Sequence, residues 1–386
     1  MPAVRNPSVA TQMNRPDRLA VIWTNFGPYH VARIRALTKY FDVAAIQLAG
    51  SERLYGWVAE MKGLNASIHT LCDGAWEDQS RVSVAYRLWR KLDQLQPQTL
   101  LVPGYATAPA LTAALWGRLH RSRTLLMSES NADDHLRRWW VESAKRCLVR
   151  SLFDGAVVGG KRAQKYMAFL GLSGADVATG YDAVDNDFLL HRVEQARSAG
   201  RPAALADPYF LYVGRMAPEK NLDALIQAFA EYRKIGGAWS LVLVGEGPLG
   251  DSLREEAARL GCADAIRFAG HKSAAELAVY YAHAGCFVLP STREPWGLVV
   301  NEAMAAGLPV IVSSRCGCAD DLVEDGANGF LVNPDDTSAM AGLLGRVSAM
   351  PLTTLAAMGR RSREIVCNYS PEKFASGVRR IAGGPN

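Results

Sequence analysis

PSTREPWGLVVNEAMAAGLPVIVSSRCGCADDLVEDGANGFLVN, residues 290–333, is the stretch from which the fold can be predicted. It follows an apolar strand expected at Cys286–Leu289 and begins as a polar loop. A helix is expected at residues 298–306, and it ends at Gly307, a residue type that commonly terminates helices. A second strand is expected at Pro309–Val312. Strand, helix and strand in this order indicate a βαβ unit and hence a parallel sheet.

Two glutamates of this stretch, Glu294 and Glu302, stand eight residues apart, one in the loop and one a turn inside the helix. The helix amino terminus between them offers free N–H groups and the positive end of the helix dipole, which suit a phosphate. Carboxylates accept hydrogen bonds from hydroxyls, so Glu294 suits a sugar and Glu302 a ribose on either side of a diphosphate. A surface glutamate and a helix-capping glutamate in an ordinary βαβ unit are the alternative. The residues expected around the phosphates are Trp296, Gly297, Leu298 and Val299.

The length of 386 residues exceeds one typical core and predicts two domains. Hydrophobic residues make up 49% and charged residues 21%, and no apolar run reaches the ~20 residues of a membrane span. The first 16 residues lack the apolar core of a secretory signal and are expected to be a disordered lead. Seven scattered cysteines favour reduced thiols and a cytoplasmic location. The net charge of +5 favours acidic ligands or lipid headgroups without being diagnostic.

Expected strands and helices alternate through both halves of the chain, which predicts an α/β fold with doubly wound parallel sheets. The first half opens with a strand at Arg18–Trp23, a loop containing Gly27, where a ligand can approach the backbone closely, and a helix at Val31–Lys39. The second half restarts with a strand at Tyr209–Val213. Ligands of such sheets bind at the carboxyl ends of the strands. The expected segments are the lead (1–16), a first domain (17–190), a linker (191–207), a second domain (208–365) and a C-terminal helix (366–386).

A loop of the second half, GRMAPEKN at residues 214–221, carries two cations five residues apart, Arg215 and Lys220. An arginine fork and a lysine point charge can together stabilise a leaving diphosphate. Their spacing alone favours two solvated loop charges, whereas the glutamate pair downstream favours contact with a diphosphate.

The E-x7-E spacing of Glu294 and Glu302, the string EAMAAGLPVI and the later EDGANGFLV together resemble the retaining glycosyltransferases of family 4, or glycosyltransferase group 1. GRMAPEKN is similar to the G-R-x-x-x-E-K-N/G loop of that family. The spacing alone is a weak signal, but the whole string in this order is specific. The resemblance implies a GT-B fold, with two Rossmann-like domains facing across a cleft and the C-terminal helix crossing back to the first domain. It also implies that Gly214, Gly245, Gly247 and Gly270 lie around the nucleotide.

The resemblance further implies transfer of a sugar, with retention, from a UDP- or GDP-sugar to a hydroxyl of a glycan, a lipid-linked or a small-molecule acceptor. In the front-face substitution expected of this family, the departing phosphate itself deprotonates the acceptor. Catalysis then rests on positioning and on stabilisation of the leaving group, with no metal or other cofactor. The residues expected to take part in catalysis are Glu294, Arg215, Lys220 and Glu129.

The chain departs from the family pattern at two places. Glu129 stands at a strand end where many relatives have a histidine that bonds the donor sugar. It could bond a sugar hydroxyl, support an oxocarbenium-like transition state or act as a base, with a helix-capping acid as the alternative. Asp182 and Ala183 stand where asparagine and glycine are usual. Two other functions stay open: a nucleotide-sugar-binding partner protein with weak catalysis, and another GT-B enzyme such as an epimerase.

Basic residues and tryptophans are interleaved in the first half, where Trp139 and Trp140 lie in a basic helix. This composition suits peripheral contact with an anionic membrane on its inner face, with solvated helix faces as the alternative. Nucleic acid is disfavoured, because the family signals explain the charge. The residues concerned are Arg87, Trp89, Arg90, Lys91, Arg118, Arg121, Arg123, Arg137, Arg138, Lys145, Arg146, Arg150, Lys161, Arg162 and Lys165.

Overall fold

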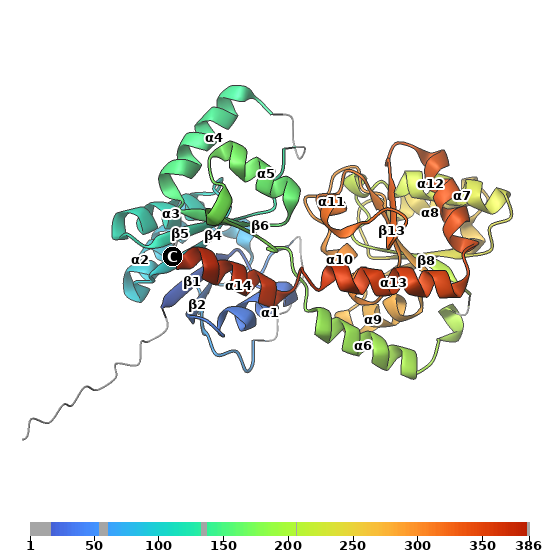
Figure 1. Cartoon of the computed structure of the whole chain (residues 1–386), viewed down its shortest axis with the longest axis horizontal. Coiled ribbons are helices and arrows are strands. Elements are labelled where there is room, and N and C mark those ends of the chain that lie inside the picture. Colours follow the sequence, from blue (N-terminus) through green and yellow to red (C-terminus); the bar gives the residue numbers. More distant parts are fainter. Residues whose placement is uncertain (1–16, 54–60, 133–136, 206, 384–386) are drawn as a thin grey trace, which may run out of the picture.

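The computed structural model describes residues 17–53, 61–132, 137–205 and 207–383, which form two α/β domains side by side (Figure 1). Each domain is built on one sheet, and all the paired strands in both sheets run parallel. The predicted fold class is therefore confirmed. The lead expected at residues 1–16 lies outside the described residues.

The first sheet has seven strands in the order β3-β2-β1-β4-β5-β6-β7. Strand β1 packs on both faces, because Ala20 and Ile22 join one apolar cluster while Leu19 and Val21 join another. Burial on both faces is why the strand reads as a continuous apolar run. The strands are β1 (Arg18–Trp23), β2 (Asp42–Gln47), β3 (Ser67–Thr70), β4 (Thr99–Pro103), β5 (Arg123–Ser128), β6 (Gly155–Val158) and β7 (Val177–Thr179).

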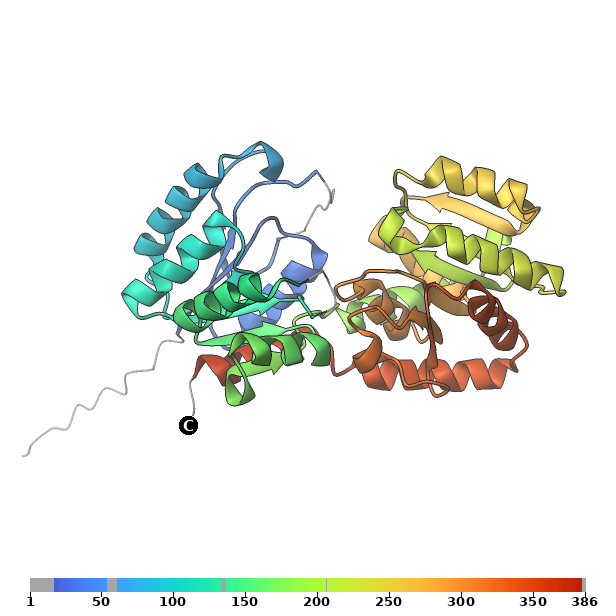
Figure 2. The same ribbon diagram turned by 90° about the horizontal axis from the view of Figure 1, so that it is seen from above.

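Helices α2 to α5 cover one face of this sheet, and α1 covers the other together with the C-terminal helix α14 (Figure 2). Helix α1 begins at Pro28, three residues before the expected start at Val31, because proline fits the first helical turn. The helices are α1 (Pro28–Leu37), α2 (Arg81–Leu95), α3 (Ala108–His120), α4 (Trp139–Leu152) and α5 (Lys161–Leu170). Among the described residues, no helix has the length and apolar character needed to cross a bilayer.

The second sheet has six strands in the order β10-β9-β8-β11-β12-β13, and the predicted βαβ unit is β11, α10 and β12. The strands are β8 (Tyr209–Val213), β9 (Ser240–Val244), β10 (Ile266–Gly270), β11 (Cys286–Leu289), β12 (Val310–Ser313) and β13 (Gly329–Val332). The helices are α7 (Leu222–Lys234), α8 (Gly250–Arg259), α9 (Ala274–His283), α10 (Leu298–Ala305), α11 (Ala319–Leu322), α12 (Thr337–Ser348) and α13 (Leu352–Val366).

The chain passes between the domains twice. Helix α6 (Asn186–Ser198) takes up the beginning of the predicted linker, and the Asp185 side chain caps it by accepting a hydrogen bond from Phe188 N. Helix α14 (Pro371–Ala382) returns to the first domain, where Arg380 Nη1 donates to Ala175 O at 2.7 Å. The predicted crossing of the C-terminal helix is thus confirmed, whereas the residues chosen as domain boundaries stay predictions.

Polar contacts join the two domains directly. Arg162 of α5 pairs with Asp320 of α11 at 2.7 Å, and Lys161 Nζ donates to the Asp320 carbonyl oxygen at 2.8 Å. Two cations of the predicted basic group therefore bind the second domain.

Candidate active site

A cavity of about 430 Å³ lies between the carboxyl ends of strands from both domains. The loops after β1, β4 and β5 line it from the first domain, and the loops after β8 and β11 line it from the second. This is the edge at which parallel sheets bind ligands. The structure brings together nine of the predicted site residues here: Glu129, Gly214, Arg215, Lys220, Glu294, Trp296, Gly297, Leu298 and Val299.

The two predicted cations enter the cavity already paired with glutamates. Arg215 Nη2 lies 2.8 Å from Glu219 Oε1, four residues along the same loop. Lys220 Nζ forms an ion pair with Glu294 Oε2, and Ser291 Oγ donates to the same oxygen at 3.3 Å. The ion pair holds the loop after β8 against the loop after β11. A bound diphosphate would therefore exchange one anionic partner of Lys220 for another.

The amino terminus of α10 faces the same cavity, and its geometry depends on Gly297. Gly297 has φ 104°, a left-handed conformation that only glycine adopts without strain. An added Cβ would also lie 3.1 Å from Leu289 and 3.3 Å from Glu294. Because the first turn of a helix has no internal partners for its N–H groups, Leu298 and Val299 offer donors to an anion.

Three of the predicted glycines, Gly245, Gly247 and Gly270, pack behind the residues that line the cavity. The Gly245 N–H donates to Gly270 O at 2.9 Å, and a Cβ on Gly245 would lie 2.0 Å from Gly214 O. A Cβ on Gly247 would lie 2.4 Å from the carbonyl oxygen of Met216. These glycines let the loops after β8, β9 and β10 pack closely. Gly27 is the N-cap of α1, with its N–H bonded inside that helix start.

Glu302 is held by two tyrosines rather than lining the cavity. Tyr29 of the first domain donates to Glu302 Oε1 at 2.7 Å, and Tyr281 of the second donates to Oε2 at 2.8 Å. Burial raises the pKa of the Glu302 carboxyl, and the two hydroxyl donors oppose that rise. The hydrogen bond expected between Glu302 and a ribose stays a prediction. It requires that at least one of the two tyrosine hydroxyls release its Glu302 oxygen.

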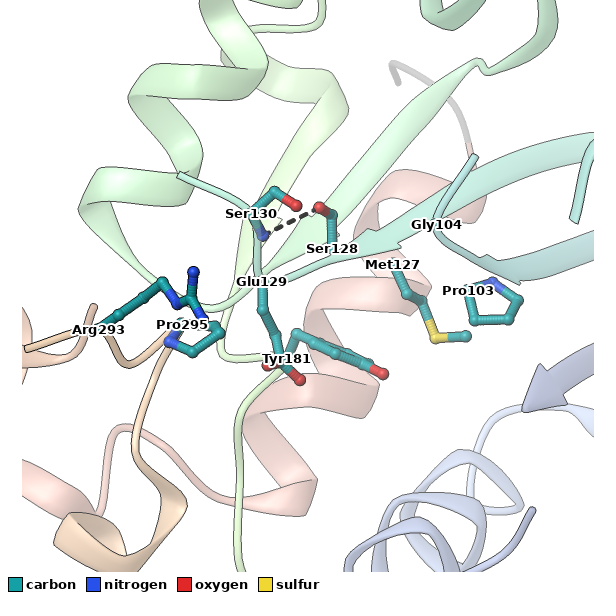
Figure 3. Close-up of a pocket in the computed structure, with 9 residues that line it drawn as sticks. All are labelled: Pro103, Gly104, Met127, Ser128, Glu129, Ser130, Tyr181, Arg293 and Pro295. Atoms are coloured by element: carbon teal, nitrogen blue, oxygen red, sulfur yellow. Dashed lines mark hydrogen bonds between the residues drawn. The ribbon is translucent and has the colours of Figure 1, made fainter. Parts of the chain in front are cut away.

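Glu129 lines this cavity and also a second one of about 460 Å³, which residues of both domains line. Figure 3 shows its side chain between Tyr181 and the loop that carries Arg293 and Pro295. It follows β5, whose last residue Ser128 accepts a hydrogen bond from Ser130 N at 3.2 Å. The carboxyl of Glu129 therefore stands where the two cavities meet, across from the second domain.

His30 is a cavity residue that the sequence reasoning missed. Its Nδ1 accepts a hydrogen bond from Gly27 N at 2.9 Å, and its ring lies 4.7 Å from that of Trp23. Burial, with a smaller contribution from Arg33, lowers the pKa of His30 to about 3. The imidazole is therefore neutral at pH 7. The sequence does contain a signal for this location. His30 comes two residues after Pro28, on the first turn of a helix that follows a strand, and such turns lie at the ligand-binding edge of a parallel sheet.

Chemically, one side of the site suits an anion and the other suits hydroxyls. Arg215, Lys220 and the start of α10 supply positive charge and N–H donors. Glu294 and Glu129 supply acceptors from opposite domains. Among the described residues, no group of three or more His, Cys, Asp or Glu side chains is arranged to hold a metal ion.

Comparisons with known sequences find relatives for part of the chain, most of it in the second domain. Residues 195–365 match the family model of glycosyl transferases group 1. The D-inositol 3-phosphate glycosyltransferase of Acidothermus cellulolyticus is 38% identical over 147 residues, which are 36% of this chain and 32% of that protein. A GDP-mannose-dependent alpha-(1-6)-phosphatidylinositol monomannoside mannosyltransferase of Mycolicibacterium smegmatis is 36% identical over 163 residues, 40% of this chain and 42% of that protein. The matches thus span less than half of these relatives.

Comparisons with solved structures cover both domains. The crystal structure of Anabaena Alr3699/HepE in complex with UDP matches with a TM-score of 0.74 at 16% identity, over 96% of this chain and 100% of that one. Sucrose-phosphate synthase from Thermosynechococcus elongatus matches with a TM-score of 0.72 at 20% identity, over 95% and 98%. Identities this low establish the fold alone. The chain therefore has the GT-B fold, and residues 195–365, which make up most of its second domain, match the family model of glycosyl transferases group 1.

Proposed function

We propose that the protein is a retaining glycosyltransferase that moves a sugar from a nucleotide-sugar donor, a UDP- or GDP-sugar, to an acceptor hydroxyl. The observation that carries the proposal is the Lys220–Glu294 ion pair at the amino terminus of α10. A cation next to a helix amino terminus suits a diphosphate. The carboxylate that a diphosphate would release from Lys220 is then free to accept hydrogen bonds from the attached sugar.

In the proposed reaction, Arg215 and Lys220 bind the diphosphate and stabilise the charge that develops as it leaves. The bond between the sugar C1 and the phosphate oxygen breaks, while a bond between C1 and the acceptor oxygen forms on the same face. The acceptor proton passes to the departing phosphate. Glu294 and Glu129 hold the sugar ring from the two domains, and no metal ion takes part. The sequence leaves the acceptor as a glycan, a lipid-linked or a small molecule.

The experiment has two stages. Thermal unfolding is first followed with UDP-, GDP- and ADP-sugars, because a ligand of the native state at 100 times its Kd stabilises it by roughly 2.7 kcal/mol. The stabilising donor is then incubated with the protein, with water as acceptor, and proton NMR records the first anomer released. An α-linked donor should give the α-sugar first, and EDTA should leave the rate unchanged.

The same measurements separate the alternatives. Release of the β-anomer first would refute retention, and loss of the rate in EDTA would refute the metal-free mechanism. Donor binding without turnover, even with candidate acceptors, would identify a nucleotide-sugar-binding partner protein. Conversion of the donor into an isomeric nucleotide sugar would identify an epimerase.

We also propose that the first domain contacts an anionic membrane surface peripherally. Trp139 and Trp140 at the start of α4 are 81% and 55% exposed. The acids of α2 and α4 are hydrogen-bonded to other side chains of the domain: Asp93 of α2 accepts from Trp116 Nε1 at 2.7 Å, and Glu142 of α4 accepts from Tyr166 at 2.6 Å. The outward charge of α2, α3 and α4 is therefore basic, and exposed aromatic rings among basic residues suit a lipid interface.

Sedimentation with vesicles tests this surface. The protein should sediment with phosphatidylglycerol vesicles at low salt and much less with phosphatidylcholine vesicles. The double variant Trp139→Ser/Trp140→Ser should weaken binding. Ile235→Ser, which removes a 75% exposed apolar residue from the second domain, is the matched control. Equal sedimentation of the double variant and the wild type would show that α4 does not contact the lipid.

A further inference from the structure

Asp182 is a buried acid that the proposed mechanism does not use. Its side chain is 0% exposed, and among the described residues neither of its carboxyl oxygens has an N–H or O–H donor within hydrogen-bonding distance. The nearest cation, Arg33, is 3% exposed and lies 4.0 Å away between Nη2 and Oδ1. A carboxylate in that position would lack the donors that stabilise buried charge.

The neighbour of the Asp182 carboxyl is a second carboxyl, that of Glu129, which raises the pKa of Asp182 both by its charge and by a hydrogen bond between the two side chains. Two carboxylates cannot hydrogen-bond each other, because each offers only acceptors. One proton between them provides the missing donor. That proton also removes the repulsion between two carboxylates and avoids a buried charge on Asp182.

The groups that face the pair come from several elements. Arg33 of α1 stacks on the Tyr181 ring at 4.5 Å and donates weakly to Ala183 O at 3.5 Å. His30, also of α1, faces Arg33 and is neutral. From the second domain, Asn301 donates to the Asp182 backbone oxygen at 3.2 Å and accepts from Trp296, and Arg293 lines the same cavity as Glu129 (Figure 3). Arg33 is thus the cation that faces Asp182, while Arg293 lies on the Glu129 side of the pair.

Burial decides which of the two acids holds the proton. Asp182 is fully enclosed, whereas Glu129 lines both cavities. Burial and the neighbouring Glu129 raise the pKa of Asp182 well above its usual value, and Arg33 opposes this rise. The proton therefore belongs on Asp182, and the negative charge faces the cavities on Glu129.

We propose that Asp182 is a positioning residue that keeps its proton at neutral pH and donates a hydrogen bond to Glu129. The bond holds an ionised Glu129 carboxyl in one orientation where the two cavities meet. Asp182 stands where asparagine is usual in the family that the sequence resembles, and protonated aspartic acid supplies the same kind of donor as an asparagine amide. The consequence for turnover rests on the proposed function, but the protonation state does not.

Infrared spectroscopy of the unliganded protein tests the proton directly. Protonated carboxyl groups have a carbonyl stretch separate from that of carboxylates. At pH 7 the spectrum of Asp182→Asn should lack part of this absorption relative to the wild type. Asp320→Asn is the matched control, because Arg162 lowers the pKa of Asp320 and this residue is already ionised. Identical carbonyl absorption in Asp182→Asn and the wild type would overturn the proposal.

Glu129→Gln provides a second, independent variant if Asp182→Asn does not fold. The glutamine amide can donate to an Asp182 carboxylate and removes the negative neighbour. The carbonyl absorption of Asp182 should therefore titrate at lower pH in this variant than in the wild type. An unchanged titration would show that the two carboxyls do not share a proton.

Kinetics test the positioning role once a donor is known. Asp182→Leu should lower kcat about tenfold, the effect of losing one hydrogen bond to a charged group, and Asp182→Asn should restore most of it. The wild-type kcat should fall as pH rises through the pKa of Asp182, and this alkaline fall should vanish in Asp182→Asn. A fall that persists in Asp182→Asn would refute the role. If no variant turns over any donor, the proposed function fails while the infrared result still decides the proton.

Discussion

Tyr29 of the first domain donates a hydrogen bond of 2.7 Å to Glu302 of the second, 273 residues further along the chain. The bond links the start of α1 to α10, the helix whose amino terminus faces the cavity. It occupies an oxygen of the carboxylate that the sequence predicted to hold ribose. Nucleotide binding through Glu302 would therefore compete with a contact between the domains.

The variant Tyr29→Phe removes this competing hydroxyl. Because an intramolecular hydrogen bond contributes roughly 0.5–1.5 kcal/mol net, the affinity for UDP or GDP should rise about two- to tenfold. Isothermal titration calorimetry measures it, with Tyr86→Phe on α2 as the control, since Tyr86 is 62% exposed. Weaker binding in Tyr29→Phe would mean that Tyr29 itself contacts the nucleotide.

The variant Glu302→Gln tests the predicted ribose contact from the other side. An amide is a poorer acceptor for two hydroxyls than a carboxylate, so affinity should fall for free UDP or GDP and for the sugar nucleotide alike. The loss should be roughly 1.5–3 kcal/mol, as for hydrogen bonds to charged groups. If the sugar nucleotide alone binds more weakly, the assignments of Glu294 and Glu302 must be exchanged.

The variant Lys220→Ala removes the predicted diphosphate cation. Affinity for the sugar nucleotide should fall by roughly 1.5–3 kcal/mol, because a charge-assisted contact is lost. The fold should be kept, as judged by circular dichroism. Lys234→Ala at the exposed end of α7 removes the same charge outside the cavity and should bind like the wild type. Equal affinity in both variants would remove Lys220 from the site.

Local patterns made part of this arrangement predictable. The strands and the loops after β8 and β11 follow from apolar runs that end at glycine and polar residues, and these loops carry Lys220 and Glu294 to one cavity. The start of α1 and the presence of α6 were missed although Pro28 and Asp185 are local signals for them. The two helix starts were missed because a turn-rich segment was interpreted as a loop and a polar segment as a linker.

Pairings between distant residues were not predictable from such patterns. Tyr29 with Glu302 and Glu129 with Asp182 depend on how the two domains and neighbouring strands pack, which no single segment encodes. For the same reason the sequence did not show which of the predicted basic residues contact the second domain and which stay exposed. Arg162 binds Asp320 of the second domain, whereas other members of the group stay exposed on α4.

The folded state should lose stability in acid because of His30. Its pKa is lowered to about 3, so between pH 6.5 and that value the unfolded chain binds a proton that the native state does not. The free energy of unfolding should therefore fall as pH decreases through this window, by roughly 1–3 kcal/mol from this residue. Urea unfolding at pH 7 and pH 5 measures the difference.

His30→Asn should reduce this dependence, because asparagine keeps an acceptor for Gly27 N and takes up no proton. His271→Asn, at an exposed loop position, is the control and should behave like the wild type. An equal loss of stability at pH 5 in His30→Asn and the wild type would assign the acid sensitivity to other groups.

Glu294→Ala and Glu129→Ala should each lower turnover while nucleotide binding survives. Both carboxyls line the same cavity from opposite domains, so both can accept hydrogen bonds from one sugar ring when the donor is held by Arg215 and Lys220. Loss of contacts that tighten in the transition state lowers kcat more than ground-state affinity, and a loss of about 10²–10³-fold in single-turnover rate is expected for each variant.

Glu294→Ala also leaves Lys220 without its partner, so UDP affinity should stay the same or rise. Single-turnover transfer and UDP titration separate the two effects. Full activity in Glu129→Ala would return that residue to the role of a loop acid, and weakened UDP binding in Glu294→Ala would place its carboxylate on the nucleotide rather than on the sugar.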